Sequence, residues 1–110
     1  MKNGLITSPD GTKRWFKDNQ LHRADGPATI HPNGDEYYFL NGDLHREGGP
    51  AITMSGFCSA WFINGKRHRL DGPAVEFLSS GFKQWFLNGR GIVCDSQEQF
   101  ERLIKLKAFL

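Results

Sequence analysis

The sequence predicts a mainly β protein, an antiparallel β-meander of hairpin repeats in a single twisted sheet, with a capping α-helix at its C-terminal end. Three observations predict this fold. An aromatic residue followed by Phe recurs at Trp15, Tyr38, Trp61 and Trp85, with spacings of 23, 23 and 24 residues. An Asn-Gly dipeptide follows the last three of these pairs at a constant distance. After Arg90, the apolar residues change from strand-like to helix-like spacing.

The composition is that of one globular domain spanning residues 1–110. Hydrophobic residues make up 38% of the chain and charged residues 24%, which excludes a disordered protein. Thirteen glycines and five prolines indicate many turns between short strands. The formal net charge of +2 is too small to imply nucleic-acid binding by itself. Its positive sign also argues against a protein that mimics DNA through acidic residues.

The lack of a recognisable targeting signal and the cysteine spacing predict a cytoplasmic protein without membrane attachment. No apolar run approaches the roughly 18 residues that a membrane-spanning helix needs, and the first residues do not resemble a signal peptide. Cys58 and Cys94 have no metal-type spacing and occupy non-equivalent positions in the repeat. We expect both to be reduced thiols.

Each repeat unit reads as a hairpin. An alternating aromatic strand, such as residues 35–40 or 82–87, leads into Asn-Gly, which suits a type I′ turn. A return strand such as residues 66–77 follows, bent at its Gly-Pro because proline cannot donate a ladder hydrogen bond. In the first unit Asp18-Asn19-Gln20 replaces Asn-Gly, so we expect a looser hairpin there. The predicted units are 15–37, 38–60, 61–84 and a partial unit 85–94.

Shorter elements flank the repeats. Residues 4–7 are a strand candidate closed by a Ser-Pro-Asp-Gly turn, which brings the expected total to about eight strands. A helix is expected over residues 96–109, capped by Ser96 with Gln99 or by Asp95 with Glu98. This helix should cover the open face or the end of the sheet, since repeat arrays need such caps to stay soluble.

The stretch from Trp61 to His68, Trp-Phe-Ile-Asn-Gly-Lys-Arg-His, resembles the MORN repeat (membrane occupation and recognition nexus). Where MORN units continue His-Gly-x-Gly, this chain has His68-Arg69-Leu70-Asp71-Gly72-Pro73-Ala74. That variant is similar to a repeat in uncharacterised bacteriophage proteins. The resemblance covers residues 12 to 90. It implies a scaffolding or binding role, a phage origin and no catalytic residues.

The histidines of the repeat form the first candidate row, made of His22, His45 and His68. Two strands per unit place equivalent residues about 10 Å apart along a sheet. Such a row cannot chelate one metal ion, because tetrahedral ligands must converge at about 2 Å. We therefore predict no metal site and no cofactor, and expect one ring nitrogen of each histidine to bond the backbone.

Arginines and aromatic residues form two further rows. An aspartate stands two residues after Arg23 and Arg69, at Asp25 and Asp71. In the middle unit, the residue two positions after Arg46 is Gly48. We expect a bend in which Asp accepts Arg or backbone hydrogen bonds; the alternative is a row of cations for an acidic or phosphate-bearing partner.

The first aromatic of each pair should face opposite to the following Phe. One row can be core beneath the helix, and the other must line a groove, contact a second copy or be shielded by charged side chains.

These rows predict a non-enzymatic protein-binding module. Given the resemblance, the expected role is a phage-encoded inhibitor or adaptor of a host protein, perhaps one of a defence system. Trp61, Trp85 and Arg69 are the expected energetic centres. One alternative is a module for nucleotides or single-stranded nucleic acid, and another is a self-associating structural protein such as a homodimer. The candidate binding residues are Trp15, Tyr38, Trp61, Trp85, Arg23, Arg46, Arg69, His22, His45 and His68.

Overall fold

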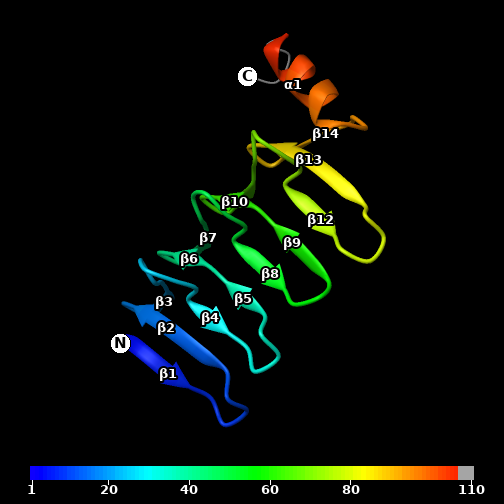
Figure 1. Ribbon diagram of the computed structural model, residues 1–110. Helices are drawn as coiled ribbons and strands as arrows, with labels where there is room; N and C mark the ends of the chain where they lie inside the picture. The colour runs from blue at the N-terminus through cyan, green and yellow to red at the C-terminus, as the bar shows by residue number, and fades with distance from the viewer. Residues whose placement is uncertain (107–110) are drawn as a thin grey trace.

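The computed structural model describes residues 1–106 and shows short strands followed by one helix (Figure 1). The helix is α1 (Gln97–Lys105). The strands are β1 (Gly4–Thr7), β2 (Lys13–Lys17), β3 (Gln20–Leu21), β4 (Thr29–Ile30), β5 (Glu36–Tyr37), β6 (Phe39–Leu40), β7 (Asp43–Leu44), β8 (Ile52–Met54), β9 (Cys58–Ala60), β10 (Phe62–Ile63), β11 (Lys66–Arg67), β12 (Val75–Phe77), β13 (Lys83–Leu87) and β14 (Arg90–Ile92).

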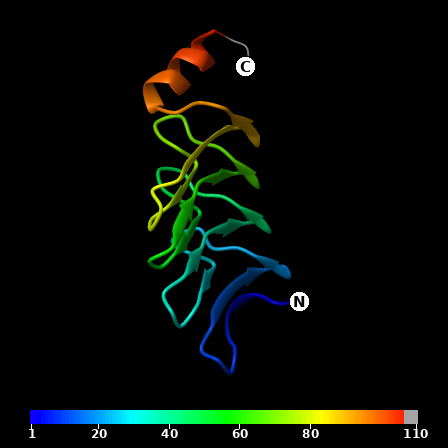
Figure 2. The ribbon, with the colours of Figure 1, turned by 90° about the vertical axis from the view of Figure 1, so that its right-hand side faces the viewer.

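One antiparallel sheet organises these strands. Its order is β1-β2-β4-β5-β8-β9-β12-β13-β14, with β3 paired beside β2, so nine strands follow one another in chain order. The predicted mainly β meander with a C-terminal helix is therefore confirmed. The pairs β6–β7 and β10–β11 form separate hairpins. In Figure 2 these hairpins stack above one another along the long axis, and the β13–β14 hairpin and then α1 follow them.

The hairpin turns follow the Asn-Gly prediction. Asn41, Asn64 and Asn88 each have a φ of 49°, and the glycine after each also has a positive φ. Both central residues of a type I′ turn require this left-handed conformation, which Asn and Gly tolerate best.

The expectation of a looser first hairpin is wrong. Asp18 and Asn19 have φ values of 50° and 68°, and Lys17 pairs directly with Gln20 across the same two-residue turn. Short polar side chains can adopt this conformation without glycine. The N-terminal segment also holds the turn, because the backbone N–H of Asn19 donates to the carbonyl of Lys2 at 2.9 Å.

The expectation of one bent return strand over 66–77 is also wrong. β11 ends at Arg67 and pairs with β10, whereas β12 begins at Val75 and pairs with β9 and β13. Between them, residues 68–74 form a bend that leaves the main sheet. The aromatic strands of the two middle units are interrupted as well, at Tyr38 and at Trp61.

The helix begins where the capping pattern predicted. Ser96 is the N-cap, and its hydroxyl accepts from the backbone N–H of Gln99 at 3.1 Å. The helix ends after Lys105, so the predicted extension to 109 is not seen at Leu106, and residues 107–109 lie outside the described part of the chain. Within residues 1–106, no helix is both long enough and apolar enough to cross a bilayer.

Within residues 1–106, buried apolar side chains form two small clusters. The first contains the buried residues Ala51, Ala60, Phe62 and Val75. The second contains Trp85, Leu87, Ile92 and Phe100, and it joins the last hairpin to α1. The helix therefore caps the end of the array. Trp85 is the member of the first aromatic row that belongs to the cluster completed by α1. The prediction that one whole aromatic row forms a core beneath the helix is therefore wrong.

Candidate functional site

The histidine row connects neighbouring units. The Nδ1 atom of each histidine accepts a hydrogen bond from the backbone N–H of the turn asparagine one unit later. The three bonds are Asn41 to His22 at 2.9 Å, Asn64 to His45 at 2.9 Å and Asn88 to His68 at 3.0 Å. Because Nδ1 acts as acceptor, the ring carries its proton on Nε2 in this geometry. The row thus fixes the stacking of successive hairpins.

The arginine row folds back onto the aromatic row of the same unit. The guanidinium carbon lies 3.9 Å from the Trp15 ring centroid for Arg23, 4.1 Å from Tyr38 for Arg46 and 3.8 Å from Trp61 for Arg69. The Nη1 atom of each arginine also donates to the carbonyl of the proline four residues later, at 3.2 Å in all three units. Each bend is therefore closed by a cation–π stack and a hydrogen bond.

The aspartates complete two of the three bends. Arg23 Nε donates to Asp25 at 3.1 Å and Arg69 Nε donates to Asp71 at 2.8 Å, as the sequence predicted. The hydrogen bond from Arg69 holds the pKa of the Asp71 carboxyl below its usual value. In the middle unit Gly48 replaces the aspartate, and among residues 1–106 Arg46 has no ion pair.

Long cationic side chains shield the second aromatic row as well. The Arg67 guanidinium lies 5.6 Å from the Phe62 ring and 5.5 Å from the Phe86 ring, and the Lys2 ammonium lies 5.1 Å from the Phe16 ring. Phe62 is buried in the first core cluster, and Phe86 packs against that cluster. Among these three rings, the expected shielding by a charged side chain therefore applies to the partly exposed Phe16 and Phe86.

Two equivalent grooves lie between successive bends. The first groove has a volume of about 400 Å³ and the second about 260 Å³. Each is bordered by the bend of one unit and floored by the aromatic, aliphatic and histidine side chains of the next. The first is lined by Arg23, Ala24, Asp25, Gly26, Tyr38, Leu40, His45, Arg46 and Glu47. The second is lined by Arg46, Glu47, Gly48, Trp61, Ile63, His68, Arg69, Leu70 and Asp71.

The third copy of this groove is filled by α1. The floor positions of the second groove, Trp61, Ile63 and His68, correspond in the last unit to Trp85, Leu87 and Ile92. These three residues form a core cluster with Phe100 of the helix, which is completely buried. The helix thus occupies the surface that the first two copies leave open.

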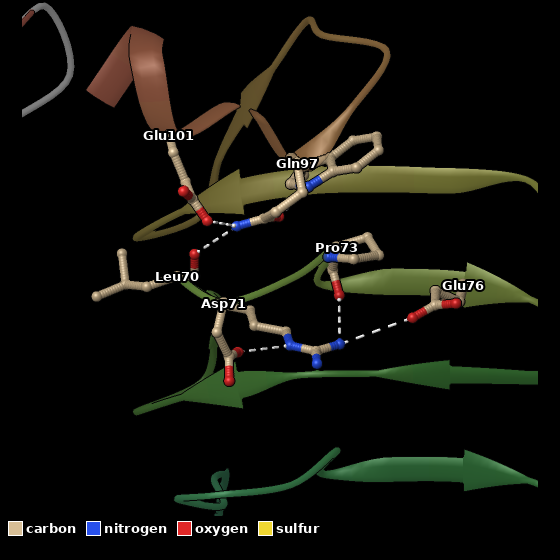
Figure 3. Close-up of polar contacts among 8 residues, drawn as sticks. Leu70, Asp71, Pro73, Glu76, Gln97 and Glu101 are labelled. Carbon is tan, nitrogen blue, oxygen red and sulfur yellow. Dashed lines mark hydrogen bonds and ion pairs between the residues drawn. The ribbon is translucent and has the colours of Figure 1, made fainter. Parts of the chain in front are cut away.

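Gln97 fixes the helix to both sides of this third copy (Figure 3). Its Oε1 accepts from the indole Nε1 of Trp85 at 2.8 Å, and its Nε2 donates to the backbone carbonyl of Leu70 in the preceding bend at 2.9 Å. Nε2 also donates to Glu101 one turn later at 2.8 Å. Val93 stands where the other units have arginine, and it is 97% exposed. The last unit therefore has no arginine at this position to stack on the Trp85 ring, and α1 packs there instead.

The structure therefore divides the candidate residues into two groups. Tyr38, Trp61, Arg46, Arg69, His45 and His68 line the two open grooves, and Arg23 lines the first. Trp15 and His22 lie in the first hairpin and line neither groove, and Trp85 is 7% exposed beneath α1. Leu40, Ile63 and Glu47 also line the grooves but were not among the predicted residues, although their fixed distance from the aromatic residues was a usable signal.

The remaining reactive side chains do not form an obvious centre. Burial raises the pKa of the Cys58 and Cys94 thiols, which disfavours the nucleophilic thiolate. Both cysteines are unpaired. Within residues 1–106, no group of three histidine, cysteine or carboxylate side chains could hold a metal ion.

Comparisons with known proteins leave the interpretation to the geometry. No family model matches the chain, and no curated protein or solved structure matches it significantly. The resemblance to MORN repeats and the phage origin that it suggests stay predictions.

The histidine row gives a direct test of the stacking. Replacing His45 with Leu should lower the free energy of unfolding by about 1 kcal/mol, because the Asn64 N–H loses its acceptor. His45→Asn should recover most of this loss, since its amide oxygen can take the place of Nδ1. Urea unfolding of both variants measures the difference, and equal losses would contradict the role of Nδ1.

Proposed function

We propose that this protein is a non-enzymatic protein-binding module that uses the two open grooves as its contact surface. The observation that carries the proposal is the contrast between equivalent sites. The chain fills the third copy of the groove with its own helix and leaves the first and second open. The host partner, the inhibitor or adaptor role and the cytoplasmic setting stay predictions from the sequence.

The chemistry of the grooves supports a protein partner. Each groove combines an aromatic ring, an aliphatic side chain and arginine with acidic residues on the border. Rings and arginines held rigid at the centre of a surface contribute most of the binding energy in protein interfaces. Here the stack and the proline carbonyl already fix the arginines, so little side-chain entropy is lost on binding.

The nucleic-acid alternative is less well supported. Bases stack on open aromatic faces, but guanidinium groups lie within 3.8–4.1 Å of the Trp15, Tyr38 and Trp61 centroids. Carboxylates on the groove borders would also repel phosphates. Among the arginines of the row, Arg46 keeps its charge without a carboxylate partner among the described residues.

Self-association has one favourable observation. β1 is the first strand in the sheet order, and no described strand pairs with its outer edge. Leu5 and Ile6 of this strand are 49% and 41% exposed. Unpaired edges of this kind can join two copies. A self-associating protein would show a mass that rises with concentration, which analytical ultracentrifugation measures.

Site-specific photo-crosslinking tests the proposed function. A photoreactive amino acid placed at Leu40 or Ile63 lies on a groove floor but outside the two core clusters. In cells that produce the protein, both positions should give one common crosslinked protein that survives nuclease treatment.

Leu78 provides the matched control for this experiment. It is apolar and 61% exposed, but it lines neither groove. The same products from Leu78 and Ile63 would contradict the proposal. Products that disappear with nuclease would favour the nucleic-acid alternative instead.

A further inference from the structure

We infer that the second groove binds an amphipathic α-helix of the partner protein, in the way that α1 occupies the third copy. This inference rests on the proposed function and specifies the partner's chemistry. The helix α1 is itself amphipathic, with Phe100, Leu103 and Ile104 packed on the last hairpin and Glu98, Glu101 and Arg102 exposed. When a helix binds in a groove, its anchor residues recur at this spacing on one face of the helix.

The floor of the second groove repeats the floor beneath α1 with small changes. Ile63 replaces Leu87 as the aliphatic residue, and Trp61 replaces Trp85 as the indole. His68 stands in place of Ile92, which makes one side of the second groove more polar. A partner helix can therefore place an aromatic side chain over Ile63, as Phe100 joins Leu87 in the second core cluster.

The hydrogen-bonding groups that hold Gln97 have open counterparts in this groove. Among the described residues, the indole N–H of Trp61 forms no hydrogen bond, whereas that of Trp85 donates to Gln97. The carbonyl of Glu47 occupies the bend position that Leu70 occupies beside α1. A glutamine on the partner helix, three residues before an aromatic anchor, would satisfy both groups.

The first groove fits this ligand less well. Its aromatic residue is Tyr38, which has no indole N–H at this position, and its bend contributes Ala24 and Asp25. The two grooves share Arg46, the row's arginine without a carboxylate partner among the described residues. An acidic residue on the partner helix facing Arg46 would add a charge-assisted hydrogen bond.

The chain's own helix supplies the probe. A fluorescently labelled, acetylated and amidated peptide of residues 95–106 would be titrated into the full-length protein and followed by anisotropy. We expect saturable binding with a Kd on the order of 0.1–1 mM, because a peptide of this length is only marginally helical in water.

Matched variants locate the peptide. Trp61→Phe keeps a ring but removes the indole donor, so it should weaken binding about three- to tenfold. The corresponding Trp85→Phe should not weaken binding, because its groove is already filled. Phe100→Ala in the peptide should weaken binding about tenfold or more.

Two outcomes would overturn the inference. One is the absence of saturable binding at millimolar peptide. The other is binding that responds to Trp85→Phe but not to Trp61→Phe, which would mean that the peptide replaces α1. If either occurs while crosslinking at Ile63 still captures a protein, the proposed function stands and the helical partner is wrong.

Discussion

Replacing Gly72 with Ala should lower the free energy of unfolding by about 2–3 kcal/mol, although the backbone at this position suits alanine. A Cβ at Gly72 would lie 2.5 Å from Arg69 Cζ and 2.8 Å from Nε and Nη2. That guanidinium is packed against the Trp61 ring and bonded to Asp71 and to the Pro73 carbonyl. The added methyl group must therefore displace the stack that closes the bend. Urea unfolding followed by circular dichroism measures the loss.

A double-mutant cycle with Arg69→Ala isolates this clash. Arg69→Ala alone should also destabilise, since it leaves the Pro73 carbonyl without its donor. In the double variant the methyl group no longer meets a guanidinium, so the two losses should not add. Additivity to within about 0.5 kcal/mol would show that the clash is absent. Gly26→Ala is the matched control, with a smaller expected loss because its Cβ would lie 3.0 Å from Arg23 Cζ.

Local rules explain why much of the fold could be predicted from the sequence. The Asn-Gly turns, the strand at residues 4–7 and the Ser96 cap each depend on one or two neighbouring residues. Such features appear in the sequence at fixed offsets. The first hairpin was wrongly predicted to be looser because it lacks the Asn-Gly dipeptide. Asp18 and Asn19 reach the same conformation, with help from a distant segment at Lys2.

The arrangement of the site depends on contacts that sequence spacing does not reveal. The repeat predicted an arginine row, but not that each guanidinium would lie between an aromatic ring and a glycine of its own bend. Residues 68–74, which hold this packing in the third unit, lie between β11 and β12 and divide the predicted return strand. Such bends also border the grooves. The missing arginine at Val93 was visible in the sequence, yet its consequence required seeing α1 against Trp85.

Replacing Phe100 with Ala should lower the free energy of unfolding by about 3–4 kcal/mol, the largest loss expected from a single side chain here. Phe100 is completely buried, and its ring is the part of α1 that completes the cluster of Trp85, Leu87 and Ile92. Without it, the short helix keeps its cap and the Gln97 hydrogen bonds but loses most of its apolar contact. Helices of this length do not persist in water without packing, so α1 should detach in part.

The variant should also make the third groove resemble the other two. Partial release of α1 would expose Trp85, and its fluorescence should shift to longer wavelength before global unfolding begins. Val93→Ala is the control, because Val93 is 97% exposed and its truncation should change the unfolding free energy by less than about 0.5 kcal/mol. If Phe100→Ala loses less than about 1 kcal/mol with no shift, α1 is not held by its apolar face. In that case the groove floor would contribute little to binding any helix, which would also contradict a helical partner in the second groove.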